Sequence, residues 1–202
     1  MLERVFERFG ELLDVRLERG VFTTEDSVRY TFYTALLEIE HLGPEDIVLE
    51  HPHPVIAGAE IDTLIPGFPP GGLAIEFKYD RAMPSGRNAP RPQKAGKAIQ
   101  DLHRLGRLPA EMRRVFVYAT DPEMAAYFAS PKNGLVGMFN LTFGHQLAID
   151  DGFLATRCAT LRHSAGATPN VTISAEFLRS LPRGHELRIY RVEGLEHRAS
   201  HS

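Results

Sequence analysis

Two short strand-like runs separated by a Pro/Gly-rich turn limit the folds open to this chain more than any other feature. The runs are AEIDTLI, near residues 59–65, and GLAIEFKYD, near residues 72–80, with PGFPPGG between them. Clusters of proline and glycine reverse the chain, so the two runs predict a β-hairpin. Because alternate residues of a strand share a face, Glu76 and Lys78 are expected on one side and Phe77 on the other.

The segments around this hairpin alternate between helical and strand-like patterns. Before the hairpin, we expect an amphipathic helix over 2–18, a largely apolar helix that follows the Thr23/Thr24 caps and is closed by Gly43 and Pro44, and a strand near 46–56. After the hairpin, we expect a helix at about 92–106, a strand RRVFVYATD and a helix PEMAAYFAS. From Lys132 onwards, the pattern indicates short strand-like pieces that end in HELRIYRVE. This order predicts an α/β fold, a single domain over residues 1–202 with a central mixed β-sheet flanked by helices.

Composition places the chain among ordinary globular proteins, with 43% hydrophobic and 24% charged residues. Its first twenty residues are charged throughout, which is typical neither of a signal peptide nor of a membrane span, so no membrane association is expected. Cys158 is the only cysteine, so the chain has no intrachain disulfide and no cysteine-based metal site. A cytoplasmic protein is the simplest interpretation.

The net charge of −3 is unevenly distributed. Residues 1–76 hold 5 Lys/Arg against 15 Asp/Glu, whereas residues 78–114 hold 10 Lys/Arg against 3 Asp/Glu. An acidic region beside a basic one is what a metal-dependent site acting on a polyanion would require. Internal neutralisation of the two regions in the fold would give the same distribution.

Asp62, Glu76 and Lys78 are the chemically suggestive residues of the hairpin. Two carboxylates a few ångströms apart can hold Mg²⁺ or Mn²⁺, and the metal polarises a phosphoryl oxygen and lowers the pKa of a bound water. A neighbouring ammonium can orient that water or stabilise the charge that develops on the phosphate. These residues therefore favour phosphodiester hydrolysis, although an amphipathic strand with a solvated Glu/Lys face would show the same pattern.

The spacing of these residues resembles the signature of the PD-(D/E)xK nuclease superfamily, which has a restriction-endonuclease-like core. Asp62 is followed, after 13 residues and a turn, by Glu76-Phe77-Lys78, and Ile61 stands where the named motif has proline. The order helix–strand–strand–strand–helix–strand is also similar to that of the family core. The resemblance covers about residues 24–120 and leaves a C-terminal extension, about 132–202, without an assigned role.

The resemblance implies further site residues on the flanking helices. Many members carry an acidic residue in the first core helix that completes the metal site, and Glu25 matches it. Some carry a glutamine and a second polar residue four positions later on the helix after the lysine strand, which implies Gln93 and Lys97. Without the resemblance, Glu25 would be a first-turn acid that complements the helix dipole. Gln93 would belong to a solvated polar stripe, the members of which are Gln93, Lys97, Asp101 and Arg104.

Basic residues after the hairpin are candidates for contacts with the phosphate backbone of DNA, because arginine forks and lysines suit phosphate. The candidates are Arg81, Arg87, Arg91, Lys94 and Lys97. Arg81, Arg87 and Arg91 would equally serve as loop solubilisers, and Lys97 as part of a solvated helix face. No base-reading element is apparent.

Two other groups of residues carry weaker signals. In HPHP, His51 and His53 would share one face of a strand, as a metal-binding pair does, but no third ligand is apparent. RCATLRHSAG contains Cys158, His163 and Ser164 without an oriented acid, which argues against a hydrolase triad.

The expected function is a Mg²⁺- or Mn²⁺-dependent nuclease that cleaves nucleic acid, DNA in the first place, in restriction, defence or repair. Asp62, Glu76, Lys78 and Gln93 would be its catalytic residues, with Asp62, Glu76 and Glu25 around the metal. The resemblance implies a homodimer for cutting both strands. The alternative is a non-catalytic module on the same fold that binds nucleic acid or protein.

Overall fold

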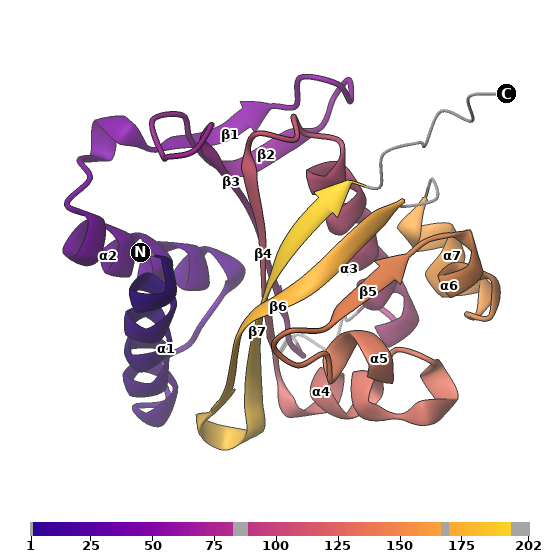
Figure 1. Cartoon of the computed structure of the whole chain (residues 1–202). Coiled ribbons are helices and arrows are strands. Elements are labelled where there is room, and N and C mark those ends of the chain that lie inside the picture. The colour runs from indigo at the N-terminus through magenta and orange to yellow at the C-terminus, as the bar shows by residue number, and fades with distance from the viewer. Residues whose placement is uncertain (1, 83–88, 167–169, 195–202) are drawn as a thin grey trace, which may run out of the picture.

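The sheet of this protein has seven strands among the described residues, and helices pack on both of its faces (Figure 1). The structure is a computed structural model that describes residues 2–82, 89–166 and 170–194. The strands are β1 Val48–Pro52, β2 Glu60–Ile65, β3 Leu73–Asp80, β4 Arg113–Thr120, β5 Gln146–Ile149, β6 Val171–Leu181 and β7 His185–Gly194. The sheet order β1-β2-β3-β4-β7-β6-β5 places β3 and β4 in its interior. The expected α/β fold with a mixed central sheet is confirmed.

Helices flank the sheet as two unequal layers. They are α1 Leu2–Glu18, α2 Glu25–Glu40, α3 Arg91–Gly106, α4 Pro122–Ala129, α5 Val136–Phe139, α6 Asp151–Ala155 and α7 Ala159–Ala165, with 3₁₀ turns at Pro44–Asp46, Pro131–Asn133 and Pro182–Gly184. The pair α1 and α2 covers one face, and α3 with the shorter helices lies on the other (Figure 1). No helix among the described residues is long and apolar enough to cross a membrane.

The predicted hairpin forms, with β2 antiparallel to β3 and Leu64 opposite Ala74. β3 then pairs with β4 in parallel, because the chain returns through α3 to the same end of the sheet. Side chains of β3 alternate between two hydrophobic cores. Ala74 belongs to the core under α3, while Phe77 packs with Phe32 of α2, their ring centroids 5.3 Å apart. Burial on both faces explains why β3 reads as a nearly continuous apolar run.

The C-terminal third differs from the short strand-like pieces that its sequence suggests. Residues 136–165 contain the helices α5, α6 and α7, each of one or two turns and so too short for a clear helical period. β6 and β7 form a long hairpin, and β7 pairs antiparallel with β4. The end of the described chain therefore completes the middle of the sheet. The first strand is also shorter than expected, covering only Val48–Pro52.

Close helix packing holds α7 against α3. A Cβ atom added at Gly96 would lie 2.4 Å from the carbonyl oxygen of Leu161, so only glycine allows this approach. The contact fixes α3 between the sheet and α7 and determines which side of α3 meets β3.

The start of α2 is set by Thr24, whose side chain accepts a hydrogen bond of 3.2 Å from the Ser27 N–H. Thr24→Ala removes this cap and is expected to lower the free energy of unfolding by about 1 kcal/mol. Thr34→Ala, in the exposed middle of the same helix, is the matched control and is expected to change stability by less than about 0.5 kcal/mol. Urea unfolding of the two variants provides the measurement, and equal effects would contradict the capping role.

Candidate active site

The side of β3 that faces α3 carries three charged residues at alternate positions, Glu76, Lys78 and Asp80. Glu76 is 2% exposed and Asp80 is 4% exposed, while Lys78 is half-buried. The prediction that Glu76 and Lys78 share a face is confirmed, because Phe77 lies in the opposite core. Burial of Glu76 excludes the solvated strand face as an explanation of this pattern. Buried charges require partners, and neighbouring elements supply them.

Two carboxylates occupy the edge of β3 beyond its pairing with β2. The pairing of β2 with β3 ends at Thr63 and Ile75, so the next N–H groups along that edge need other acceptors. The N–H of Phe77 donates to Asp62 Oδ2 at 2.8 Å, and the N–H of Tyr79 donates to Glu25 Oε2 at 2.9 Å. These backbone contacts bring Asp62 from β2 and Glu25 from α2 to the strand that carries Glu76 and Lys78.

Each of these two carboxylates also has a cationic neighbour. Arg29 of α2 donates to Asp62 Oδ1 at 3.2 Å and reaches Glu50 at 3.8 Å. Lys78 Nζ lies 3.2 Å from Glu25 Oε2. The first turns of α2 therefore contribute both an acid and a base to the site.

The helix α3 supplies a second pair of charges, Asp101 and Arg104, on the other side of Lys78. Asp101 is 4% exposed, forms an ion pair with Arg104, and lies 3.9 Å from Lys78 Nζ. Arg104 also approaches Glu76, with 3.7 Å between its guanidinium and Oε2. Acids and bases thus alternate around the site, from Glu25 through Lys78, Asp101 and Arg104 to Glu76.

The surroundings of Glu76 make its charge unfavourable. Burial raises the pKa of this carboxyl well above its ordinary value, and repulsion from Asp62 and Asp101 raises it further, while Arg104 opposes the shift. The Glu76 Oε1 atom is buried and has no hydrogen-bond partner among the described residues. Burial likewise raises the pKa of Asp101 to about 6, against the opposing charges of Lys78 and Arg104.

Lys78 is held in its charged form. Burial disfavours the ammonium, but the carboxylates of Asp101 and Glu25 outweigh it and raise the pKa above the ordinary lysine value. A protonated lysine therefore stands next to Glu76 along the strand at neutral pH. An ammonium in this position can donate to an anion but cannot act as a general base.

Asp62 and Glu76 suit a hard divalent cation such as Mg²⁺ or Mn²⁺. Both donors are oxygens, their carboxylates repel each other, and Oε1 of Glu76 lacks a partner. Mg²⁺ is commonly held by one or two carboxylates, with waters filling the other positions. Within residues 2–82, 89–166 and 170–194, no three His, Cys, Asp or Glu side chains are arranged to hold a metal ion together. Glu25 instead contacts Lys78 and the Tyr79 N–H, and its metal role stays a prediction.

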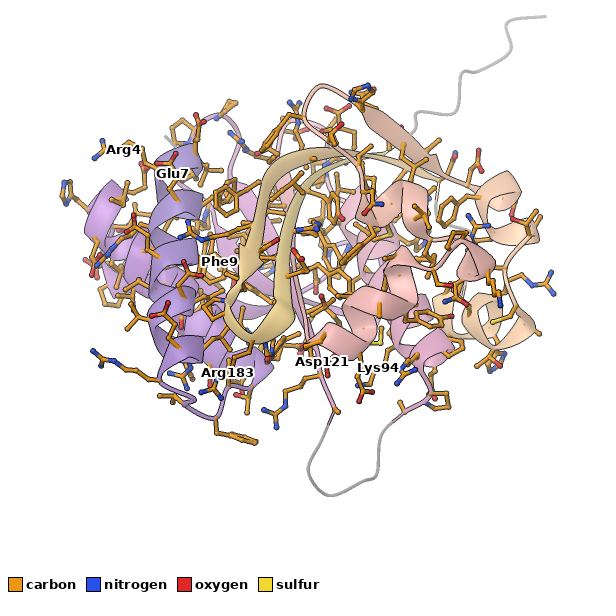
Figure 2. All side chains as sticks on the ribbon, turned by 90° about the horizontal axis from the view of Figure 1, so that it is seen from below. Arg4, Glu7, Phe9, Lys94, Asp121 and Arg183 are labelled. Carbon is orange, nitrogen blue, oxygen red and sulfur yellow. The ribbon has the colours of Figure 1, made fainter. Side chains whose placement is uncertain are left out.

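Beyond Lys78, the site continues towards α4. Tyr118 of β4 donates to Asp80 Oδ2 at 2.8 Å, and burial raises the pKa of this carboxyl. Lys94 of α3 donates to the carbonyl of Arg81 at 2.5 Å. Figure 2 shows the labelled Lys94 and Asp121 near each other at the lower edge of the view. Both residues line a small hollow.

The predicted helix and loop residues divide into two groups. Lys94 is half-buried and points towards β3, whereas Gln93 and Lys97 are exposed on α3, Lys97 donating to Gln100 at 3.0 Å. None of the contacts described above joins Gln93 to the carboxylates, so its catalytic role stays a prediction.

The predicted phosphate-binding arginines have protein partners where the structure describes them. Arg81 lies over the ring of Phe22, 4.0 Å from its centroid, and donates to the Thr23 carbonyl at 2.7 Å. Arg91 pairs with Glu123 at 2.6 Å. Arg87 lies outside the described residues. Contacts of these side chains with DNA stay a prediction.

The weaker candidates have structural roles. His53 is buried; its Nδ1 accepts from the N–H groups of Val55 and Ile56, and its Nε2 lies 3.0 Å from the Arg104 carbonyl. Nδ1 is therefore the acceptor and Nε2 the donor, which fixes one neutral tautomer. His51 contacts the carbonyl of Pro52.

The site residues that sequence reasoning did not assign are Asp80, Asp101, Arg104 and Arg29. Asp101 and Arg104 belong to the polar stripe of α3, and Asp101 lies seven residues after Lys94. Residues seven apart lie almost on one line of a helix, so Asp101 lies on the same side of α3 as Lys94. This spacing could have indicated from the sequence that Asp101 faces the sheet. Arg29 follows Glu25 by four residues, which places both on one side of α2.

Compared with family models, curated proteins and solved structures, this chain matches none of them.

Proposed function

We propose that this chain is a metal-dependent nuclease that hydrolyses phosphodiester bonds of nucleic acid, DNA in the first place. The observation that supports this most is Glu76, a carboxylate that is 2% exposed, has one oxygen without a partner, and lies in the field of Asp62. Such a carboxylate destabilises the folded state, because a neutral side chain of the same shape would avoid both the cost of burying a charge and the repulsion from Asp62. Strongly perturbed acids of this kind concentrate at functional sites.

In this proposal Asp62 and Glu76 hold Mg²⁺ or Mn²⁺, and the neighbouring acids and bases keep them in place. Bound there, the cation polarises a phosphoryl oxygen and lowers the pKa of a coordinated water. Lys78 donates from its charged ammonium to the phosphate oxygens as negative charge develops on them. Asp101 and Glu25 hold the ammonium in position from two sides. Lys94, Arg81 and Arg91 would contact the flanking phosphate backbone.

Cleavage of supercoiled plasmid with Mg²⁺ or Mn²⁺ tests the proposal, with Asp62→Asn as the variant. Asparagine keeps an acceptor for the Phe77 N–H or Arg29 but removes the charge, so the fold is expected to persist while cleavage falls at least about 100-fold. Asp150→Asn is the matched control, because Asp150 also accepts a backbone N–H, from Phe153 at 2.8 Å, but lies at the start of α6. Equal cutting by Asp62→Asn and wild type would refute the site.

A non-catalytic binding module is the second candidate, and the backbone contacts of Asp62 and Glu25 favour it. Both carboxylates satisfy N–H groups of β3, a role that needs no metal. Under this alternative, the protein binds DNA without cutting it, and Mn²⁺ calorimetry of wild type and Asp62→Asn gives no heat. The homodimer and the cytoplasmic location also stay predictions.

A further inference from the structure

A second hollow lies beside the carboxylate site, on the far side of Arg104. It has a volume of about 430 Å³ and lies between the loop 55–59, which joins β1 to β2, and the C-terminal half of α3. This volume falls in the range of small-ligand pockets, about 300–1,000 Å³. None of the roles proposed above uses this pocket.

The loop wall of the pocket is rigidly held by His53. Its ring contacts the N–H groups of Val55 and Ile56 on one side and the Arg104 carbonyl on the other. The backbone N–H of His53 donates to the Ala59 carbonyl at 2.8 Å. The loop is thus tied to the turn of α3 that carries Arg104. It presents an apolar surface, with Val55 55% exposed. A preformed apolar wall binds a flat ring at low entropic cost.

The opposite wall is polar and comes from one side of α3. Gln100, His103 and Arg107 follow one another at helical spacing, so their side chains lie along a single face. Within the part of the chain that the structure describes, the buried His103 Nδ1 atom has no hydrogen-bond partner. Burial together with Arg107 lowers the pKa of this histidine, which favours the neutral ring. The described residues that line the pocket include two arginines and no acid. An amide, a neutral imidazole and a guanidinium together offer both donors and acceptors.

Arg104 connects this pocket with the carboxylate site. It lines the pocket, forms an ion pair with Asp101 and approaches Glu76 at 3.7 Å. An anionic strand with one phosphate at Asp62 and Glu76 would therefore place a neighbouring nucleotide at the mouth of the pocket.

We propose that this pocket binds a nucleobase of the strand whose phosphate is cleaved, and that it gives the enzyme its preference among bases. The base face lies against the apolar loop 55–59, and the base edge meets Gln100, His103 and Arg107. Gln, His and Arg are side chains that read base edges through hydrogen bonds, and a base packed in such a pocket contributes strongly to binding. This inference rests on the proposed nuclease function, because the phosphate position determines which base enters.

Binding without cleavage tests the pocket first. Fluorescein-labelled single strands of about eight nucleotides are titrated with the protein in EDTA, using the intact strand and a series with one abasic position moved along it. We expect one position at which loss of the base weakens binding to the wild type about tenfold. Gln100→Ala/His103→Ala should bind the intact strand about tenfold more weakly and show no such position. His145→Ala/Gln146→Ala, the same pair of residue types at exposed positions where β5 begins, should behave as wild type.

Further variants and cleavage patterns keep this inference separate from the nuclease proposal. Since His103 is half-buried, the single variants Gln100→Ala and Arg107→Ala test the pocket without touching the core, and each should lose about threefold in affinity. With Mn²⁺, the base preference at cut sites of a mixed-sequence DNA should flatten in the double variant while total cutting persists. If the wild type binds every strand of the abasic series equally well, the pocket does not bind a base, even if the protein cuts DNA. If one abasic position weakens binding but no DNA is cut, only the nuclease proposal is wrong.

Discussion

Glu76→Gln is expected to eliminate plasmid cleavage and, at about pH 8, to raise the free energy of unfolding by about 1 kcal/mol or more, because a buried charge costs more to desolvate than a neutral amide. Glutamine has nearly the same shape but no charge, so the repulsion from Asp62 and Asp101 disappears while packing is kept. Loss of a metal-binding carboxylate should lower cleavage at least about 1,000-fold. Urea unfolding and plasmid cleavage of the same preparation provide the two measurements.

The stabilisation by Glu76→Gln should depend on pH with a definite sign. The pKa of Glu76 is raised in the folded protein above the ordinary value of 4.5, so between these two values the folded state binds more protons than the unfolded state. Wild-type stability therefore falls as pH rises through this window, and the variant lacks that contribution. The difference between the two proteins should be small at about pH 4 and should widen as pH increases.

Glu176→Gln is the matched control for this prediction. Glu176 of β6 is also largely buried and pairs with Arg113, but it lies away from the carboxylate site. Its replacement removes a favourable ion pair and should leave stability equal or lower at every pH. If Glu76→Gln were less stable than the wild type at pH 8, the attraction of Arg104 would outweigh burial and repulsion, and the argument from Glu76 would fail.

Lys78→Met is expected to lower cleavage about 100- to 1,000-fold, because it removes the ammonium that would stabilise charge on the phosphate. Mn²⁺ binding by calorimetry should persist, since Asp62 and Glu76 remain. The variant should also lose about 1–3 kcal/mol of stability, because Asp101 is buried and keeps only Arg104 as its counter-ion. Loss of activity in this variant alone would therefore mix a chemical effect with a structural one.

A compensating substitution separates these two effects. In Lys78→Met/Asp101→Asn the buried acid is neutralised together with its partner, so most of the lost stability should return. Cleavage should not return, because neither side chain then offers an ammonium. Lys132→Met, at an exposed position of the 3₁₀ turn Pro131–Asn133, is the control for lysine replacement in general. Recovery of cleavage in the double variant would show that Lys78 acts only through the fold.

The hairpin and its two faces could be predicted from the sequence because the evidence is local. The turn between β2 and β3 is marked by proline and glycine, and the period of two determines that Glu76 and Lys78 lie together. The position of β7 beside β4 could not be predicted in the same way. That pairing joins residues such as Val117 and Ile189, which are far apart in the chain, and no turn signal links them.

The site on α3 shows a second limit of sequence reasoning. The polar stripe is visible in the sequence, but which of its members face the sheet depends on the rotation of the helix, and one residue changes that direction by about 100°. Packing of Gly96 against Leu161 fixes this rotation. As a result Asp101 meets Lys78, while Gln93 stays exposed.

The carboxylates around β3 affect the stability of the fold in opposite ways, and this difference has a consequence for how such a protein would evolve. Asp62 and Glu25 accept hydrogen bonds from the backbone of β3, so a gene copy freed from selection for cleavage would still need an acceptor at both positions, and the present residues provide it. Glu76 weakens the folded state, so the same copy would gain from losing it. The residue at position 76 in descendants of this gene therefore reports whether selection still maintains the reaction, whereas the presence of Asp62 does not.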